Sequence, residues 1–250
     1  MKTLRSLWLP VGYYFSWGLF GLGGLALNLA CVPLLLFPGR ERHGARIRAS
    51  SRRMFEYWLR WMNYSGVILV TWRGFDRPLP AGTVYVANHP SLVDATFLLA
   101  RLPDAVCIFK PALLRNPFIA PTALMSGYVA GDRGVDLIRE AAQQVAAGKS
   151  LLIFPEGTRT RPGEILNPLK HGFALIAQRA HAPIQIIRVQ GSPGMGRKGH
   201  AWWRLPELPG RFEFSLDTLI PANALDTPAT LTERVGTRLR STLPAGPSRA

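Results

Sequence analysis

Apolar residues recur along this chain with two different periods, and the period indicates which element each segment forms. Short apolar runs rich in β-branched residues are typical of strands, whereas apolar residues three or four apart are typical of helices. Strands are predicted at 67–72, 83–87, 105–109, 150–154, 184–189 and 212–216. Helices are predicted at 95–102, 136–147 and 169–179. This alternation favours an α/β fold, in which helices cover both faces of one sheet.

The first forty residues form a long apolar segment, with no charged residue from Ser6 to Gly39. A membrane-spanning helix needs about 20 apolar residues, so this stretch is long for one crossing and short for two. The residues that interrupt it are Gly21, Gly23, Gly24 and Pro33. Because basic residues flank both ends and favour the cytoplasmic side, a re-entrant hairpin is expected over 1–40. One tilted helix is the alternative, and a cleaved signal peptide is disfavoured by the length.

A basic amphipathic helix is expected within 41–66. One face carries Ile47, Met54, Phe55, Trp58 and Met62, and another carries Arg48, Arg52, Glu56 and Arg60 at intervals of four. Such a helix either lies in the headgroup layer of a membrane or packs on a core with its arginines exposed. We expect its apolar face to contact protein or acyl chain and its arginines to meet lipid phosphate.

Composition narrows the class of partner. A net charge of +15 implies an anionic partner, either nucleic acid or an acidic membrane surface. The 48% hydrophobic content and the basic residues beside the apolar N-terminus favour the membrane. Cys31 and Cys107 lie in apolar runs, so neither a disulfide framework nor a metal site is expected.

The segment 191–203, which combines glycines with basic residues and tryptophan, is either a membrane-touching loop or a mobile one.

A polar motif, Asn88-His89-Pro90-Ser91-Leu92-Val93-Asp94, separates the strand at 83–87 from the next helix. It lies at the carboxyl end of a strand, where α/β folds place their sites. The bend lets Asp94 reach back from the first helical turn toward His89. A carboxylate on one ring nitrogen fixes the tautomer and leaves the other free to accept a proton. The alternative is structural, since Ser91 as N-cap and Asp94 also form a capping box.

A second motif, Phe154-Pro155-Glu156-Gly157-Thr158-Arg159, follows the strand at 150–154. Gly157 permits close approach of backbone, and Arg159 offers a planar, permanently charged fork suited to phosphate. The alternative is a solvated loop in a basic protein, with Glu156 in a local ion pair.

Together the two motifs resemble those of the glycerolipid acyltransferase family, whose best-known members are the 1-acyl-sn-glycerol-3-phosphate acyltransferases. His89 and Asp94 match the family's His and Asp separated by four residues, and the second motif matches in full. Two weaker blocks occur in the expected order. Residues 110–117, with Arg133 beyond them, resemble the acceptor-binding block, and 182–184 resemble the last block.

The resemblance implies one acyltransferase domain at 67–220, with a mixed sheet flanked by helices. Segment 1–40 is then the membrane segment, 41–66 the basic helix, and 221–250 a C-terminal helix with a disordered tail. It further implies a membrane-associated enzyme, and the basic residues at both ends of the apolar segment predict that the catalytic domain lies on the cytoplasmic face.

The reaction implied is transfer of a fatty acyl group from acyl-CoA or acyl-ACP to the free hydroxyl of lysophosphatidic acid or a similar lysolipid. His89 is the expected base and Asp94 its orienting partner. The expected substrate-binding residues are Glu156, Gly157, Thr158, Arg159, Lys110 and Arg133. The thioester is a co-substrate, so no cofactor or metal is expected. Departures from the family pattern leave a specialised acceptor open; they are Ala112, Ala120 and Ile186.

The sequence also predicts how the reaction proceeds. No serine or cysteine sits beside the base in a nucleophile motif, so direct attack in a ternary complex is expected. Backbone N–H groups near Gly157 or Ser91 are the expected oxyanion donors. A non-catalytic lipid-binding protein is the main rival, but it needs no paired histidine. The expected partners are membrane lipids and an anionic thioester donor, with no nucleic acid, and the oligomeric state is open.

Overall fold

A seven-stranded mixed sheet organises the protein, and the computed structural model describes residues 2–116, 119–132, 134–192, 195–224 and 226–242. Its strands are β1 (Ile68–Arg73), β2 (Val84–Ala87), β3 (Ala105–Phe109), β4 (Val129–Ala130), β5 (Ser150–Ile153), β6 (Ile184–Gly191) and β7 (Gly210–Ile220). Their order is β1-β7-β6-β2-β5-β3-β4, with every neighbouring pair parallel except β6 and β7. The predicted α/β class with a mixed sheet is therefore confirmed.

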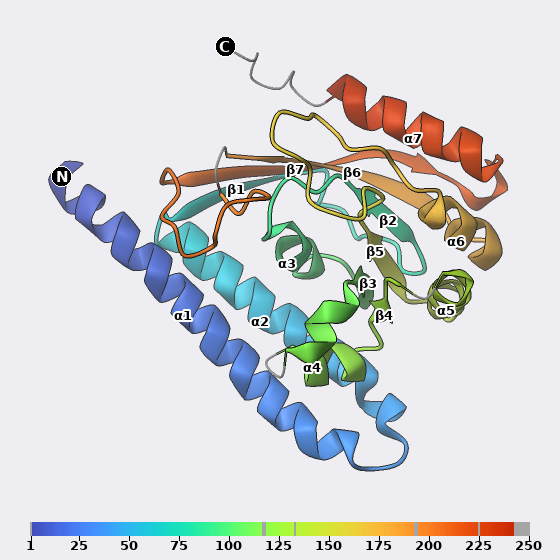
Figure 1. Ribbon diagram of the computed structural model, residues 1–250, viewed down its shortest axis with the longest axis horizontal. Helices are drawn as coiled ribbons and strands as arrows, with labels where there is room; N and C mark the ends of the chain where they lie inside the picture. The colour runs from blue at the N-terminus through green and yellow to red at the C-terminus, as the bar shows by residue number, and fades with distance from the viewer. Residues whose placement is uncertain (1, 117–118, 133, 193–194, 225, 243–250) are drawn as a thin grey trace.

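Helices flank this sheet on both faces (Figure 1). They are α1 (Lys2–Leu35), α2 (Gly44–Tyr64), α3 (Asp94–Leu99), α4 (Ala120–Met125), α5 (Val135–Ala146), α6 (Gly172–Ala180) and α7 (Pro228–Thr242). Short 3-10 helices lie at η1 (Arg40–His43), η2 (Pro111–Arg115) and η3 (Ala222–Ala224). The predicted helix at 169–179 begins later, at Gly172, because residues 169–171 continue the loop that follows β5.

Alternation along β2 shows why the sheet has two cores. Tyr85 and Ala87 point to the core formed with α2 and α3, whereas Val84 and Val86 point to the core formed with α5, α6 and α7. Successive strand residues face opposite sides, and all four of these are buried. Both faces are covered, which explains why β2 and β5 are continuous apolar runs and not alternating ones.

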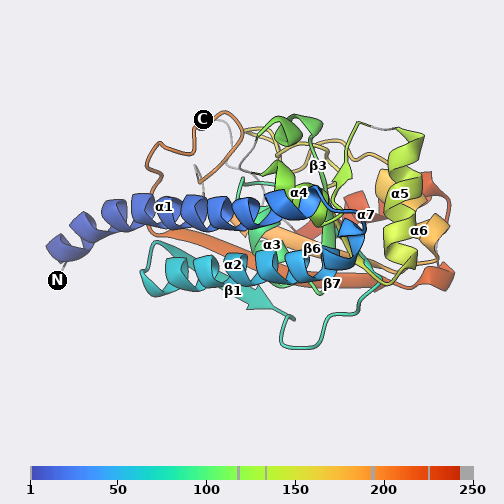
Figure 2. The ribbon, with the colours of Figure 1, turned by 90° about the horizontal axis from the view of Figure 1, so that it is seen from below.

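The N-terminal segment is one continuous helix and not the hairpin predicted within 1–40; it agrees with the alternative in being a single helix. Its stretch Leu7–Leu35 is long and apolar enough to cross a membrane, and only 11% of the most apolar window is buried. The hairpin is formed instead by α1 with α2, which lie side by side in both views (Figures 1 and 2). A glycine costs a helix only about 1 kcal/mol relative to alanine, and a Cβ on Gly23 would meet the Met54 side chain of α2 at 3.2 Å. That glycine provides close helix packing and not a break.

Helix α2 confirms the basic amphipathic helix but corrects one of its residues. Arg48, expected on the exposed stripe, is buried, and its guanidinium binds Asp104 at 2.6 and 3.0 Å and the Ser126 carbonyl at 3.1 Å. Because a buried charge must be paired, Arg48 joins the second helix to the turn before β3 and does not meet lipid phosphate. Arg52 donates to the Ala100 carbonyl, at 3.3 Å.

The C-terminal segment contains the predicted helix as α7, which packs on β6 and α6. In Figure 1 it lies on the opposite side of the sheet from α1. The predicted disordered tail falls at 243–250, outside the described residues.

Candidate active site

The two polar motifs lie at one edge of the sheet, on adjacent parallel strands. The first follows β2 and the second follows β5, which pair in register from Val84–Leu151 to Val86–Ile153. Because parallel strands end at the same edge, segments 67 residues apart meet directly. The backbone N–H of His89 donates to Glu156 Oε1 at 2.8 Å, and the His89 carbonyl accepts from Thr160 N at 2.8 Å. The two motifs are therefore in direct contact in the structure.

The His89 and Asp94 side chains form the expected pair. His89 Nδ1 lies 3.1 Å from Asp94 Oδ2, and the same oxygen accepts the Ser91 backbone N–H at 2.6 Å. The imidazole stacks on the Phe154 ring, with centroids 4.0 Å apart. Among the described residues Nε2 has no hydrogen-bond partner, and the side chain is 18% exposed. The ring is thus fixed by one nitrogen and available through the other.

Asp94 is buried completely, and this burial raises the pKa of its carboxyl above the ordinary value of 3.8. Hydrogen bonding from His89 and Ser91 and the charge of Arg159 oppose the rise. Its other oxygen, Oδ1, has no hydrogen-bond partner in the described part of the chain. A carboxylate kept in apolar surroundings interacts strongly with any charge that develops on the imidazole.

The capping-box interpretation is only partly correct. The N-cap of α3 is Val93, two residues after Ser91, and it makes no side-chain cap. Ser91 donates its hydroxyl to the Met195 carbonyl at 2.8 Å, and the same oxygen accepts the Val93 N–H at 3.4 Å. Asp94 does accept the Ser91 N–H, so this carboxylate both shapes the bend and orients the histidine.

Glu156 belongs to the second loop, and both of its carboxylate oxygens accept hydrogen bonds from protein groups. Oε1 accepts from His89 N and from the Thr160 hydroxyl, and Oε2 accepts from Asn167 N at 2.9 Å. Burial raises the pKa of its carboxyl, and the backbone N–H groups of Asn167 and His89 oppose that rise. These contacts make Glu156 one of the residues that join the two loops, together with Thr160.

Gly157, which is exposed, and Thr158, which is half-buried, form the turn of the second loop. Gly157 has φ +67° and donates its N–H to the Phe154 carbonyl at 3.0 Å. A Cβ at this position would lie 3.1 Å from Lys170 Nζ, so a lysine ammonium stands beside the turn. Sequence reasoning missed Lys170, because an isolated basic residue in a basic chain gives no signal.

Arg159 binds a third segment that the sequence did not connect with the site. Its Nη1 donates to the carbonyls of Gly196 and Arg197, at 2.8 and 3.2 Å. Within the described residues, its Nε and Nη2 have no hydrogen-bond partner. That edge of a guanidinium makes bidentate pairs with carboxylate or phosphate.

Asn88 is a second residue that sequence reasoning did not assign. Its amide donates to the Val189 carbonyl and accepts the Val189 N–H, both at 2.8 Å, and it is buried. These bonds continue the pairing of β2 with β6 beyond the end of β2. The only sequence signal was its place directly before His89.

The acceptor block is less closely connected to the site. Lys110 is exposed at the end of β3, next to β5 in the sheet, and its side chain makes no hydrogen bond or ion pair to either loop in the described regions. Arg133 lies outside the described residues.

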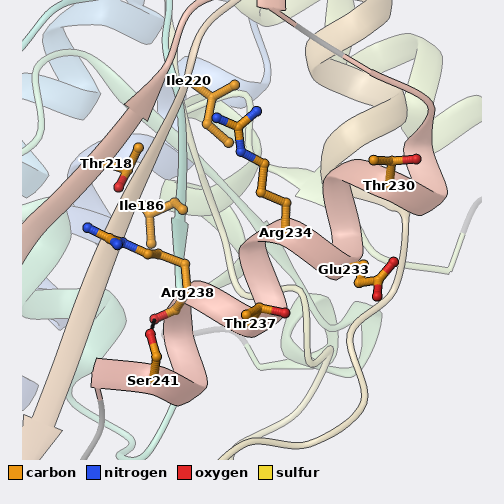
Figure 3. Close-up of a pocket in the computed structure, with 9 residues that line it drawn as sticks. All are labelled: Ile186, Thr218, Ile220, Thr230, Glu233, Arg234, Thr237, Arg238 and Ser241. Carbon is orange, nitrogen blue, oxygen red and sulfur yellow. Dashed lines mark hydrogen bonds between the residues drawn. The ribbon is translucent and has the colours of Figure 1, made fainter.

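Two hollows differ in their relation to these loops. A recess of about 120 Å³ opens between them, lined by Asn88, Pro90, Thr160, Ile165, Val189, Gln190, Gly191 and Arg197. A larger groove of about 610 Å³ lies between α7 and strands β6 and β7 (Figure 3). None of the predicted site residues lines either hollow, and Arg238 in the larger one pairs with Asp217 at 2.7 Å. The smaller recess is lined in part by Asn88, Pro90 and Thr160, which are chain neighbours of His89 and Arg159.

Comparison with known proteins gives consistent matches. Residues 75–190 match the family model described as Acyltransferase. A 1-acyl-sn-glycerol-3-phosphate acyltransferase of Helicobacter pylori is 31% identical over 167 residues, covering 64% of this chain and 67% of that protein. The protein of the same name from Limnanthes douglasii is 31% identical over 123 residues, covering 46% of this chain and 43% of the relative. This chain therefore spans two thirds of the bacterial relative and less than half of the plant one.

A solved structure extends the likeness to the whole fold. The crystal structure of the 1-acyl-sn-glycerophosphate (LPA) acyltransferase PlsC from Thermotoga maritima matches with a TM-score of 0.71, covering all of both chains at 20% identity. The similarity therefore includes the N-terminal helices as well as the sheet.

Proposed function

The chain belongs to the acyltransferase family that contains the 1-acyl-sn-glycerol-3-phosphate acyltransferases, and we propose that it esterifies the free hydroxyl of lysophosphatidic acid or a similar lysolipid with a fatty acyl group from an acyl thioester. The observation that carries this proposal is the His89–Asp94 pair, with its open Nε2, beside the unpaired edge of Arg159. Acyl transfer needs a base at the attacking hydroxyl and a cation for the acceptor's phosphate.

His89 acts as the base in this mechanism. Its Nε2 takes the hydroxyl proton while the oxygen attacks the thioester carbonyl, which gives a tetrahedral intermediate. That intermediate expels the thiolate of coenzyme A or acyl-carrier protein, and the imidazolium returns the proton to sulfur. Asp94 holds the ring through Nδ1 and stabilises the positive charge between these two steps.

The attack is direct, without an acyl-enzyme. Ser91 directs its hydroxyl to Met195 and not to His89, so it is not placed as a nucleophile. Burial raises the pKa of the Cys107 thiol to about 12, which makes it a poor nucleophile. These contacts support a ternary complex of enzyme, thioester and lysolipid.

Of the two predicted places for the oxyanion donors, near Gly157 and near Ser91, we keep the one near Gly157. The Ser91 N–H donates to Asp94 and the Gly157 N–H donates to Phe154, so both are already used. The backbone N–H groups of Thr158 and Arg159 have no acceptor among the described residues. We assign them to the carbonyl oxygen of the thioester, where negative charge develops in the transition state.

We propose three cations near the two loops as the binding groups for an acceptor phosphate. Arg159 offers its Nε–Nη2 edge, Lys170 stands beside the Gly157 turn, and Arg197 lines the small recess. Lys110 and Arg133 remain proposals for the same role. Glu156 acts by positioning His89 and does not contact the acceptor in this mechanism.

Membrane association follows from α1, whose exposed apolar surface would lie in the bilayer. Basic residues flank its apolar stretch on both sides, so we propose that α1 lies along the membrane without crossing it and that both of its ends and the catalytic domain are on the cytoplasmic face. An anionic donor, either acyl-CoA or acyl-ACP, would approach this basic protein from that side.

The decisive experiment measures acyl transfer by purified His89→Ala protein, with products identified by lipid mass spectrometry from mixed donors and acceptors. A general base contributes about 10²- to 10⁴-fold, so kcat should fall by that factor while the protein stays folded. The control is His181→Asn, at an exposed histidine that ends α6. Wild-type turnover in His89→Ala would disprove the assignment. Arg159→Lys should raise KM for a phosphate-bearing acceptor more than it lowers kcat.

A further inference from the structure

One segment outside the two motifs touches both the membrane helix and the active site. Residues 195–204, here called the tryptophan arch, belong to the connection between β6 and β7. In Figure 1 this connection lies beside the N-terminal half of α1. Trp202 and Trp203 are 46% and 59% exposed, although large aromatic side chains are usually buried.

The arch is attached to the apolar helix α1 by two hydroxyl groups. Tyr13 donates to the Trp202 carbonyl at 2.6 Å, and Tyr14 donates to the Trp203 carbonyl at 3.0 Å. The Trp17 and Trp202 rings lie 5.5 Å apart. The neighbouring exposed residues of this part of the helix are Leu7, Val11, Tyr14 and Phe15. The arch therefore extends the apolar surface that α1 presents.

The other end of the arch is bonded to both catalytic loops. The Met195 carbonyl accepts from the Ser91 hydroxyl, and the Gly196 carbonyl accepts from Leu92 N at 2.9 Å and from Arg159 Nη1 at 2.8 Å. Gly196 has φ +64°, and a Cβ there would lie 2.9 Å from Ser91 Oγ. No other residue fits this contact without displacing the first loop.

The charge of the arch indicates which surface it meets. Residues 195–204 include Arg197, Lys198 and Arg204 and contain no acidic residue. Tryptophan prefers the boundary between acyl chains and headgroups, and basic residues beside it are attracted to anionic lipids. A soluble partner does not explain why this segment is bonded to the helix long enough to span a bilayer.

We propose that the tryptophan arch docks into the headgroup layer of an anionic membrane and that its docked position holds the His89 and Arg159 loops in their catalytic arrangement. The binding part of this proposal stands independently, whereas the catalytic part rests on the proposed function. The chain of contacts runs from Tyr13 and Tyr14 through the arch to Ser91 and Arg159.

The binding part is tested with an environment-sensitive nitrobenzoxadiazole label on Trp203→Cys, reconstituted in phosphatidylcholine vesicles with or without equimolar phosphatidylglycerol. The matched control is Glu233→Cys on α7, an exposed position on the other side of the sheet. Both native cysteines are buried and should react slowly, and labelling of the unsubstituted protein measures their contribution. We expect a shift to shorter wavelength at position 203, larger with phosphatidylglycerol, and none at 233. Equal emission at the two positions would overturn the docking.

The catalytic part is tested with Tyr13→Phe/Tyr14→Phe, which removes only the two hydroxyls that hold the arch. The control is Tyr64→Phe, an exposed tyrosine at the end of α2. We expect kcat in phosphatidylglycerol vesicles to fall about fivefold for each lost hydrogen bond, with KM for the acceptor little changed. Unchanged kcat and unchanged stimulation by phosphatidylglycerol would disprove the linkage. If the wild-type protein showed no acyl transfer, the proposed function would fail while the emission measurement still decided the docking.

Discussion

Replacing Asp94 by asparagine separates the two roles that the structure gives this carboxylate. Oδ2 accepts from both Ser91 N and His89 Nδ1, so an amide oxygen in that place keeps both bonds. In the opposite orientation the amide nitrogen would face the Ser91 N–H, which places two donors together and leaves that N–H without an acceptor. The backbone therefore fixes the amide orientation, and His89 keeps its tautomer in Asp94→Asn. What is lost is the charge that stabilises the imidazolium.

The size of that loss follows from the distance. A carboxylate 3.1 Å from the ring nitrogen interacts with a unit positive charge by about 5 kcal/mol at an effective dielectric constant of about 20. The amide dipole retains part of this, which leaves about 3–4 kcal/mol, or about 10²- to 10³-fold in kcat. Asp94→Ala should lose more, because it also frees the ring and the Ser91 N–H.

Stability should change in the opposite direction. Burial raises the pKa of Asp94, so its favourable contribution to folding is present below the ordinary value of 3.8 and is lost as the pH rises through the folded value. Asparagine does not titrate. At neutral pH the variant should unfold at the same or higher urea concentration than wild type, and the difference should shrink in acid.

The assay combines steady-state acyl transfer with urea unfolding at several pH values. Asp136→Asn is the control, since that carboxyl is 74% exposed in the first turn of α5 and its loss should leave both measurements unchanged. Wild-type kcat in Asp94→Asn would refute the assignment of Asp94 as the partner of an imidazolium. A large loss of stability at neutral pH would refute the argument from burial.

Two further substitutions test the frame around the histidine. Glu156→Gln should lower kcat about tenfold, from about 1.4 kcal/mol of weakened bonding to His89 N and Asn167 N, and should leave KM for the acceptor nearly unchanged. Steady-state kinetics distinguishes this from a rise in KM alone, which would place Glu156 on the substrate. Asn88→Ala leaves the buried N–H and carbonyl of Val189 unpaired at about 1–3 kcal/mol each, so the free energy of unfolding should drop by about 2–6 kcal/mol. Urea unfolding measures this against the exposed Asn223→Ala, and an equal effect of both would contradict the role of the Asn88 amide.

Much of the sheet could be predicted because local patterns determine it. The run at 105–109 forms β3 with the predicted bounds, and the other predicted strands differ by a few residues at their ends. The meeting of the two motifs was also predictable, because β2 and β5 are each followed by a polar loop and parallel neighbours end together.

The remaining features depend on contacts between distant segments. Arg48 belongs to a stripe of charges four residues apart, and its burial depends on Asp104, 56 residues later in the chain. The continuity of α1 depends on packing against α2, which offsets the weak helix propensity of its glycines. The bonds from Arg159 to Gly196 and Arg197 join two loops that share no sequence pattern.

The reciprocal bonds between His89 and the loop that contains Glu156 and Thr160 also govern when catalysis becomes possible during synthesis. A nascent chain that ends before Asn167 contains the histidine and the aspartate. It lacks the bond from Asn167 N to Glu156, the carboxylate that also accepts the His89 N–H. Closing a stretch of this length is entropically costly until β5 joins the sheet, so the two loops should order together, late and cooperatively. A ribosome-bound intermediate would therefore lack the bonded frame of His89 until β5 joins the sheet, even though its first helix is already complete.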